Sequence, residues 1–199
     1  MSASASRTDG QDRAAVAASL SAALLSARDA AALKVHGRTE AAVLVPLFLS
    51  GGELHVVLTR RRDDLRRHAG EVSFPGGRRD PEDANLQVTA LREAHEEIGL
   101  APGGVEVVGA LQPTPTIATD YAVYPFVGLI EPGQRWVPSA DEVAEVLEFP
   151  LSTLRAGADR RRMLRRGVPF RTDVYVVGET LVWGATARML GDLLTRIPG

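Results

Sequence analysis

The sequence predicts an α+β protein, an α/β/α sandwich in which helices cover both faces of a mixed β-sheet. Stretches with apolar residues every three to four positions, typical of helices, are interspersed with short apolar runs typical of strands. The two kinds of element do not alternate regularly, as they would in a doubly wound parallel sheet. The 199 residues, 45% of them apolar, suit one hydrophobic core. We therefore expect a single domain over residues 11–199, preceded by a disordered segment, residues 1–10.

An alanine-rich stretch near the N-terminus predicts an amphipathic helix. Its apolar positions recur at three- to four-residue spacing: Val16, Leu20, Leu24, Ala27 and Ala31. Asp9 and Asp12 precede this stretch and argue against a signal peptide. No apolar run approaches the roughly 18 residues that a membrane span needs. We expect a cytoplasmic protein that does not associate with membranes.

Six short apolar runs predict the strands of the sheet. Ser50, Gly51 and Gly52 separate the first two runs, which indicates a β-hairpin. The fourth run contains Pro125, which favours a bulge or a position at the sheet edge. The runs are residues 41–49, 54–60, 105–112, 121–131, 145–151 and 174–183. The pattern that follows them predicts a closing helix over residues 185–197.

The middle of the chain carries the signals of one further helix, residues 81–98. Asp80 is a suitable N-cap, Pro81 suits the first helical position, and Asp83 suits the acidic position of a capping box. Gly99 is a natural residue for a left-handed helix end.

Three glutamates share one face of this expected helix. At about 100° per residue, Glu96 and Glu97 fall within roughly 60° of Glu93. Like charges at this spacing destabilise a helix by about 0.2 to 0.5 kcal/mol per pair, and the helix dipole disfavours anions near its C-terminal end. Hard divalent cations, by contrast, favour several carboxylate oxygens together. The cluster therefore predicts a metal site, and the opposite face predicts a core contact through Ala84, Val88, Leu91 and Ile98.

The composition removes several other chemistries. The chain has no cysteine, which excludes disulfides, thiolate zinc sites and cysteine nucleophiles. The net charge of -2 gives no reason to expect nucleic acid as a partner. Only Lys34 among the 23 basic residues is a lysine, and arginine binds phosphate as a bidentate fork. A phosphorylated small molecule is therefore expected, while the arginine-rich run at 160–166 is interpreted as a solvated face.

The acidic helix and its flanks resemble the Nudix box, the signature of the Nudix hydrolases. The matching residues are Gly77, Asp83, Arg92, Glu93, Ala94, Glu96, Glu97, Gly99 and Leu100. The resemblance implies the Nudix fold, with the box forming a loop-helix-loop. It also implies that Glu93, Glu96 and Glu97 bind Mg²⁺ or Mn²⁺ with help from a backbone carbonyl near Gly76. Arg92 would orient a glutamate while water attacks a phosphoanhydride.

The box departs from the family pattern at its acidic position. Asp83 stands where the family usually has glutamate, and one extra residue separates it from Arg92. Asp83 is therefore interpreted as a capping acid rather than a metal ligand.

The segment before the box resembles one subgroup, the coenzyme A pyrophosphatases. The matching positions are Leu58, Thr59, Arg61, Leu65, Arg66, His68, Gly70, Val72, Phe74, Pro75, Gly76 and Gly77, and residues 182–190 are also similar. The resemblance implies hydrolysis of coenzyme A or its acyl derivatives to 3′,5′-ADP and 4′-phosphopantetheine. The residues expected to bind substrate are Arg60, Arg61, Arg66, His68, Phe74 and Gly77, with Arg66 on the 3′-phosphate.

Several alternatives remain open at this stage. The catalytic residues are expected to be Glu96, Glu97, Arg92 and an acid from residues 139–146. The general base is Glu97 itself, Glu142 or Glu145. Other substrates are ADP-ribose, NADH and oxidised nucleotides, and the domain could instead be a non-catalytic ligand sensor. A monomer and a homodimer are both compatible with the sequence.

Overall fold

The computed structural model describes residues 2–64, 70–116, 120–165 and 168–197. Its helices are α1 (Ser2–Ala23), α2 (Ala27–Ala32), α3 (Leu86–Ile98), the 3-10 turn η1 (Pro102–Gly104), α4 (Leu151–Ala156) and α5 (Gly184–Arg196). Its strands are β1 (Thr39–Ser50), β2 (Glu53–Arg61), β3 (Val72–Ser73), β4 (Gly76–Arg78), β5 (Glu106–Ala110), β6 (Thr114–Pro115), β7 (Tyr121–Leu129), β8 (Val143–Pro150), β9 (Ala158–Arg165), β10 (Val168–Val177) and β11 (Thr180–Val182).

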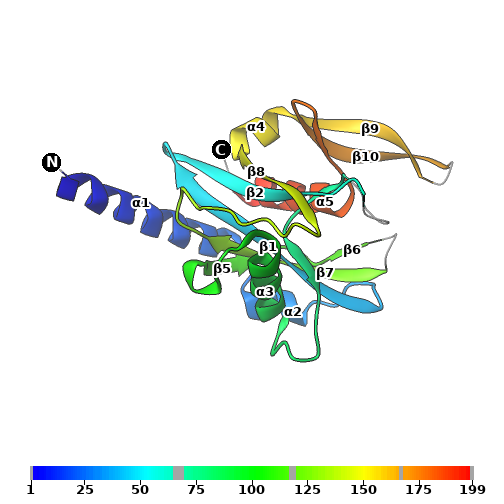
Figure 1. Cartoon of the computed structure of the whole chain (residues 1–199), viewed down its shortest axis with the longest axis horizontal. Coiled ribbons are helices and arrows are strands. Elements are labelled where there is room, and N and C mark those ends of the chain that lie inside the picture. The colour runs from blue at the N-terminus through cyan, green and yellow to red at the C-terminus, as the bar shows by residue number, and fades with distance from the viewer. Residues whose placement is uncertain (1, 65–69, 117–119, 166–167, 198–199) are drawn as a thin grey trace.

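A mixed β-sheet forms the centre of the molecule (Figure 1). Among the described residues it has eight strands, five of them in the order β3-β2-β1-β7-β5, while β4 pairs with β1, β6 with β7 and β8 with β2. The pairing of β1 with β7 is parallel, and the other pairings are antiparallel. A smaller sheet in the order β11-β10-β9 lies beside β3.

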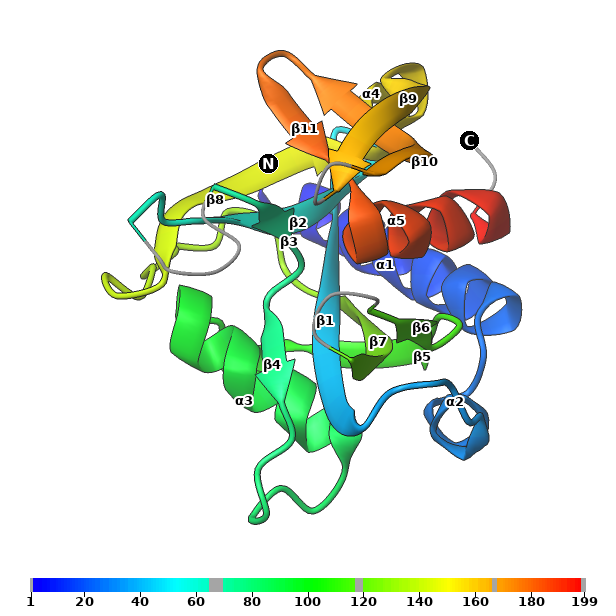
Figure 2. The same cartoon turned by 90° about the vertical axis from the view of Figure 1, so that its right-hand side faces the viewer.

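Helices cover both faces of the main sheet, which confirms the predicted α/β/α sandwich. Figure 2 shows α3 on one side of β1 and both α1 and α5 on the other. Alternate residues of β1 and β2 point to opposite faces, so each strand contributes to two cores. Val45, Leu47 and Leu58 pack on the side of α1 and α5, whereas Leu44 and Val57 pack on the side of α3.

The N-terminal hairpin forms as predicted. β1 and β2 pair antiparallel, with Ser50 opposite Glu53. Gly51 and Gly52 both have positive φ, 61° and 80°, which is the backbone conformation of a type I′ hairpin turn.

The expectation that Pro125 marks an edge strand or a bulge is wrong. β7 lies between β1 and β5 in the sheet, and the bulge lies in β5, between Val107 and Gly109. The N–H of Leu111 donates to the carbonyl of Pro125 at 2.9 Å, but β5 has already ended at Ala110. Proline has no N–H group to donate. Pro125 lies opposite the chain just beyond the end of β5, so no hydrogen bond between β5 and β7 is lost there.

The run at 174–183 is not one strand. Gly178, with φ of 56°, turns the chain so that β10 and β11 pair as a hairpin, with Val177 opposite Thr180. The arginine-rich run before it forms β9, which pairs with β10 and was not predicted as a strand. Its alternating side chains are mostly charged, so no apolar period marks it in the sequence.

The predicted N-terminal helix is divided into α1 and α2. The hydroxyl of Ser26 accepts a hydrogen bond from the N–H of Asp29 at 3.0 Å and starts the second helix. In the structure α1 begins at Ser2 and so includes most of the segment expected to be disordered. No helix within the described residues is both long and apolar enough to span a bilayer.

Candidate active site

The acidic helix α3 begins later than predicted. Its N-cap is Asn85, whose side chain accepts a hydrogen bond from the N–H of Val88 at 3.0 Å, so Asp80 is not the cap. Asp80 and Asp83 instead close a separate turn before the helix, in which the N–H of Asp80 donates to the Asp83 carboxylate at 3.0 Å. The predicted end is confirmed, because Gly99 has φ of 73° and its N–H bonds to the carbonyl of His95.

The buried stripe of α3 is rotated relative to the prediction. Ala84 precedes the helix and is exposed, and Val88 is 39% exposed. The buried apolar residues are Leu86, Ala90, Ala94 and Ile98. This rotation brings Glu97 to the edge of the core, where only 6% of the residue is exposed.

The three glutamates of α3 therefore occupy different environments. The side chain of Glu96 is 56% exposed, that of Glu93 is 17% exposed, and Glu97 is buried. Strand β4 lies against the two buried carboxylates because Gly76 and Gly77 pair with Val43 and Ala42 of β1. The sequence pattern predicted a shared face, but it could not predict this gradient of burial.

The two glycines of β4 make the close approach possible. The backbone of Gly76 hydrogen bonds to the carboxylate of Glu97. A Cβ atom at Gly77 would lie 2.4 Å from the carboxylate of Glu93, so any other residue would displace it. The N–H of Gly76 thus serves Glu97, whereas the sequence predicted a role for a carbonyl near this residue.

Arg92 holds the exposed side of the cluster together. Its Nε and Nη2 donate to the two carboxylate oxygens of Asp83 at 3.1 and 3.0 Å. Its Nη1 lies 3.0 Å from carboxylate oxygens of both Glu93 and Glu96. A further bond runs from Nη2 to the carbonyl of Arg78 at 3.2 Å. The guanidinium therefore contacts two of the three glutamates.

Asp83 is the buried anchor of this network. It is 5% exposed and also accepts a hydrogen bond from the hydroxyl of Thr89 at 2.9 Å. The hydrogen bonds from Arg92, above all, lower the pKa of Asp83 to about 2. Its oxygens are occupied by Arg92, Thr89 and the N–H of Asp80, so Asp83 fixes the loop to the helix.

A loop that precedes β8 closes the other side of the cluster. The N–H groups of Val137 and Ser139 donate to the carbonyls of Ile98 and Glu97 at 3.0 and 2.8 Å. These bonds satisfy carbonyls that the C-terminal end of a helix leaves free. The loop also carries Glu142 into the electrostatic range of Glu97.

Glu97 is the most perturbed carboxyl of the cluster. Burial, followed by repulsion from Glu142 and Glu93, raises the pKa of Glu97 to about 8, although Arg61 and the Gly76 backbone oppose the shift. Burial also raises the pKa of Glu93, against the attraction of Arg92. Arg61 stands between the acids, with its Nη1 3.5 Å from an oxygen of Glu142.

The donor set fits a hard divalent cation. Carboxylates gathered in a buried place repel one another, and a bound cation would relieve both that repulsion and the cost of burial. In the described part of the chain, no three His, Asp or Glu side chains are already arranged around one point, since Arg92 draws Glu93 and Glu96 to itself. Glu93 and Glu97, with Glu96 or Glu142 from either side, are the residues that could hold Mg²⁺ or Mn²⁺.

The residues expected to bind substrate do not all lie here. Arg61 and Gly77 border the carboxylates. Arg60 points to the other face of the sheet, where it contacts Glu145 at 3.2 Å and the hydroxyl of Thr180 at 2.8 Å. Phe74 is 1% exposed and packs in the core with α1 and α5, so its side chain is closed to a substrate. Arg66 and His68 lie outside the described residues.

Two contributors to the site were missed in the sequence. Val137 and Ser139 act only through backbone N–H groups, which carry no residue signature. On the other face of the sheet, Thr180 binds Arg60 from a strand that the sequence did not separate from its neighbour. The turn between β10 and β11 is the local sequence signal that would have separated the two strands.

Comparisons with known proteins agree with this geometry. The family described as the NUDIX domain matches residues 38–167. The uncharacterized Nudix hydrolase NudL of Citrobacter koseri is 42% identical over 162 residues, which cover 80% of this chain and 83% of that protein. NudL of Salmonella paratyphi B is 41% identical over 160 residues, 79% of this chain and 82% of that protein.

One solved structure supports the fold. The crystal structure of a MutT/nudix family protein from Enterococcus faecalis aligns with a TM-score of 0.53 at 15% identity. The alignment covers 82% of this chain and 63% of that one.

The sandwich and its loop-helix-loop, with glutamates packed against a diglycine strand, define a hydrolase that acts on a diphosphate. The chain belongs to the Nudix hydrolase family.

A first prediction concerns the anchor. Replacement of Asp83→Asn removes the bidentate partner of Arg92 and should destabilise the fold by about 1 to 3 kcal/mol at pH 7. Because the pKa of Asp83 is lowered in the folded state, to about 2, its stabilising effect is complete above the unfolded value of about 3.9. The difference between variant and wild type should shrink as pH falls from about 4 to about 2, as measured by urea unfolding. Glu82→Gln, an exposed acid of the same loop, is the control, and an equal loss there would contradict the assignment.

A second prediction concerns metal and protons. With a pKa of about 8, Glu97 is mostly protonated at pH 7 in the metal-free protein. A cation that binds this carboxylate must displace the proton, so Mg²⁺ binding at pH 7 should release close to one proton per protein, on the order of 0.9. Calorimetry in buffers of different ionisation enthalpy measures this number. We expect wild type to release this proton on Mg²⁺ binding and Glu97→Gln not to release it. Equal proton release by both proteins would exclude Glu97 as the source.

Proposed function

We propose that the protein hydrolyses the diphosphate bridge of coenzyme A and its acyl derivatives, giving 3′,5′-ADP and 4′-phosphopantetheine. The observation that carries the proposal is the placement of Arg61. This residue belongs to the segment that resembles the coenzyme A pyrophosphatases, and it lies beside Glu97 and Glu142. The same segment leads through β3 into Gly76 and Gly77, which pack on the buried glutamates.

Each residue of the cluster then has a defined role. Glu93 and Glu97 hold Mg²⁺ or Mn²⁺ with Glu96, and Arg92 keeps Glu93 and Glu96 oriented. When bound, the ion neutralises diphosphate oxygens and lowers the pKa of the attacking water. Arg61 offers its guanidinium to the substrate phosphates from the opposite side.

Glu142 is the general base that the arrangement favours. It is coupled to Glu97, whereas Glu145 pairs with Arg60 on the other face of the sheet. In the proposed step Glu142 accepts a proton from water, the water oxygen attacks one phosphorus, and the P–O bond of the anhydride breaks. The second phosphate leaves with the bonding electrons, so two phosphate monoesters form.

The substrate is tested by incubation with Mg²⁺ and a panel of coenzyme A, ADP-ribose, NADH and nucleoside triphosphates. We expect kcat/KM for coenzyme A to exceed that for the others by at least about tenfold, a difference of roughly 1.4 kcal/mol. In ¹⁸O-labelled water the label should appear on a phosphate of one product, with the 3′-phosphate ester intact. A preference for ADP-ribose or NADH would reassign the substrate, and inorganic phosphate as the first product would identify a phosphatase.

The role of the buried glutamate is tested by Glu97→Gln. This change keeps the shape but removes the charge, so turnover should fall by more than about 100-fold, beyond the effect of losing an outer-shell partner. The free energy of unfolding in the absence of metal at pH 8 should stay equal or rise, because repulsion from Glu93 and Glu142 is relieved. Glu179→Gln, at an exposed turn, is the matched control. A variant that unfolds earlier yet keeps full activity would show that Glu97 is structural.

A further inference from the structure

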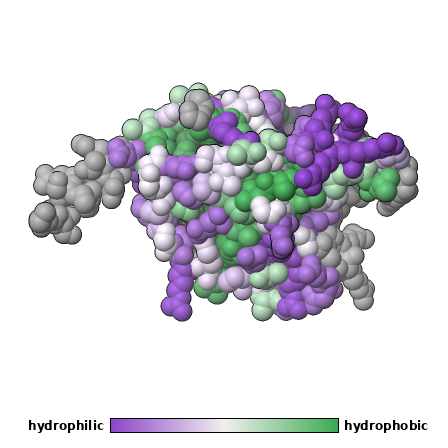
Figure 3. Space-filling model, turned by 90° about the horizontal axis from the view of Figure 1, so that it is seen from above, coloured by the Kyte–Doolittle hydropathy of each residue, from purple (hydrophilic) through white to green (hydrophobic). Residues whose placement is uncertain are grey.

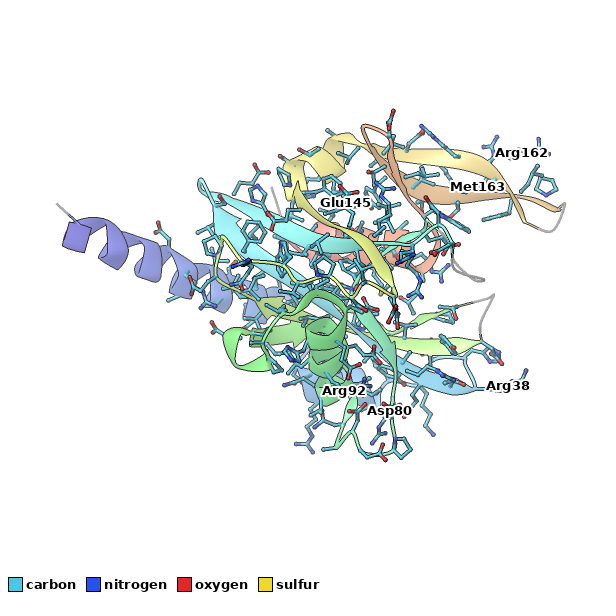
Figure 4. The ribbon with its side chains drawn as sticks, viewed as in Figure 1. Arg38, Asp80, Arg92, Glu145, Arg162 and Met163 are labelled. Carbon is cyan, nitrogen blue, oxygen red and sulfur yellow. The ribbon has the colours of Figure 1, made fainter. Side chains whose placement is uncertain are left out.

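A polar groove lies on the α5 side of the main sheet, apart from the carboxylate cluster. It has a volume of about 740 Å³ and is open to solvent, between α5 and the hairpin of β9 and β10. Small-molecule sites typically have volumes of about 300 to 1,000 Å³. Figure 4 shows Arg162 and Met163 on this projecting hairpin, well separated from Arg92 and Asp80 beside α3.

Gly191, a small residue of α5, lies next to the side chain of Tyr175 at the groove. Tyr175 of β10 and Ala187 of α5 line it from below. A Cβ atom at Gly191 would lie 3.3 Å from the hydroxyl of Tyr175, so this glycine lets the ring approach the helix. Arg188, Gly191 and Thr195 follow one another at helical spacing and present one face of α5 to the hairpin.

Arg188 is a cation of the groove without a carboxylate partner. In the described residues no Asp or Glu forms an ion pair with it, and its guanidinium donates a hydrogen bond to the carbonyl of Pro115. Partial burial lowers the pKa of Arg188, although the residue as a whole is exposed to solvent. A guanidinium in this situation gains free energy from a bound anion.

The facing strand carries further arginines on the same side. Alternation along β9 places Ala158, Arg160 and Arg162 on one face, and Ala158 and Arg160 line the groove. Arg160 lies 3.7 Å from Asp173, but both side chains are largely exposed, so the pair contributes little and leaves Arg160 available. Beyond it, Arg162 stands directly opposite Arg171, a like-charge pair that destabilises a hairpin.

Asp159 and Asp173 also line the groove, and each lies within ion-pair distance of an arginine of β9. Asp159 accepts hydrogen bonds from the Nε of Arg161 at 2.9 Å and from the N–H of Arg160. Figure 3 shows hydrophilic side chains gathered at the end of the molecule from which the hairpin projects. Charged residues on β9 also protect an edge strand from pairing with other chains. That protection explains Arg161, but it does not explain Arg188, which is on α5.

We propose that this groove binds the phosphate group of a phosphorylated small molecule, held between Arg188 of α5 and Arg160 of β9, with Arg162 and Arg171 continuing the positive surface. The groove lies across the main sheet from α3, so it is a site in addition to the carboxylate cluster. The phosphate belongs either to a remote part of the substrate or to a separate ligand. The inference does not depend on which diphosphate the enzyme cleaves.

The test uses inorganic phosphate and 3′,5′-ADP as probes, with EDTA present so that no metal binds at the carboxylates. Titration followed by amide NMR should shift the signals of Gly191 and Asp173, which line the groove. Arg188→Ala and Arg160→Ala should each weaken binding by roughly 10- to 150-fold, as expected for loss of a hydrogen bond to a charged group. Arg188→Lys keeps the charge and should bind more tightly than Arg188→Ala.

Arg28→Ala is the charge-matched control, since Arg28 is an exposed residue of α2 on the α3 side of the sheet. Arg160 is exposed on β9, so its replacement tests the site even if loss of the Arg188 bond to Pro115 disturbs folding. Equal weakening by Arg28→Ala, or shifts at Gly77 without shifts at Gly191, would overturn the proposal.

Steady-state kinetics then identify the source of the phosphate. If it is part of the substrate, Arg160→Ala raises KM by about tenfold or more with kcat nearly unchanged, as expected when uniform binding is lost. If it is a separate ligand, KM of the variant equals that of wild type while the NMR titration still shows weaker binding. Either result supports the groove, and failure of the coenzyme A assay leaves the NMR titration intact.

Discussion

The network around Arg92 is the interaction on which the acidic site depends. The guanidinium joins the buried carboxylate of Asp83 to Glu93 and Glu96, and through the carbonyl of Arg78 it also holds the end of β4. The loop before α3, the helix and the diglycine strand therefore form one rigid unit. Since a bidentate pair fixes geometry as well as charge, the Asp83–Arg92 pair holds the guanidinium where it contacts Glu93 and Glu96.

The site also shows how function opposes stability. Glu97 is buried beside Glu93 and within electrostatic range of Glu142, so burial and repulsion raise its pKa to about 8. Such a group costs the metal-free fold stability, and a bound cation would offset that cost. The loop of Val137 and Ser139 satisfies free carbonyls of α3 and thereby brings Glu142 to the cluster.

The two faces of the main sheet carry different chemistry. The α3 face carries the carboxylates of the candidate active site, whereas the groove on the α5 side is lined by two arginines and two aspartates. Alternation along β2 separates them at the shared edge, since Arg61 points to Glu142 and Arg60 to Glu145 and Thr180.

The sequence by itself determined the features that depend on neighbouring residues. These are the glycine turn of the first hairpin, the end of α3 at Gly99, and the glutamates that share one helical face. Only the tertiary structure decided the start of α3 at Asn85 instead of after the predicted cap Asp80, since the bonds of Asp83 to Arg92 hold it in the preceding loop. It also decided the parallel pairing of β1 with β7, the burial of Phe74 and the contact of Ser139 with Glu97. These contacts join segments distant in sequence, and their free energy comes from packing and backbone hydrogen bonds that no local pattern encodes.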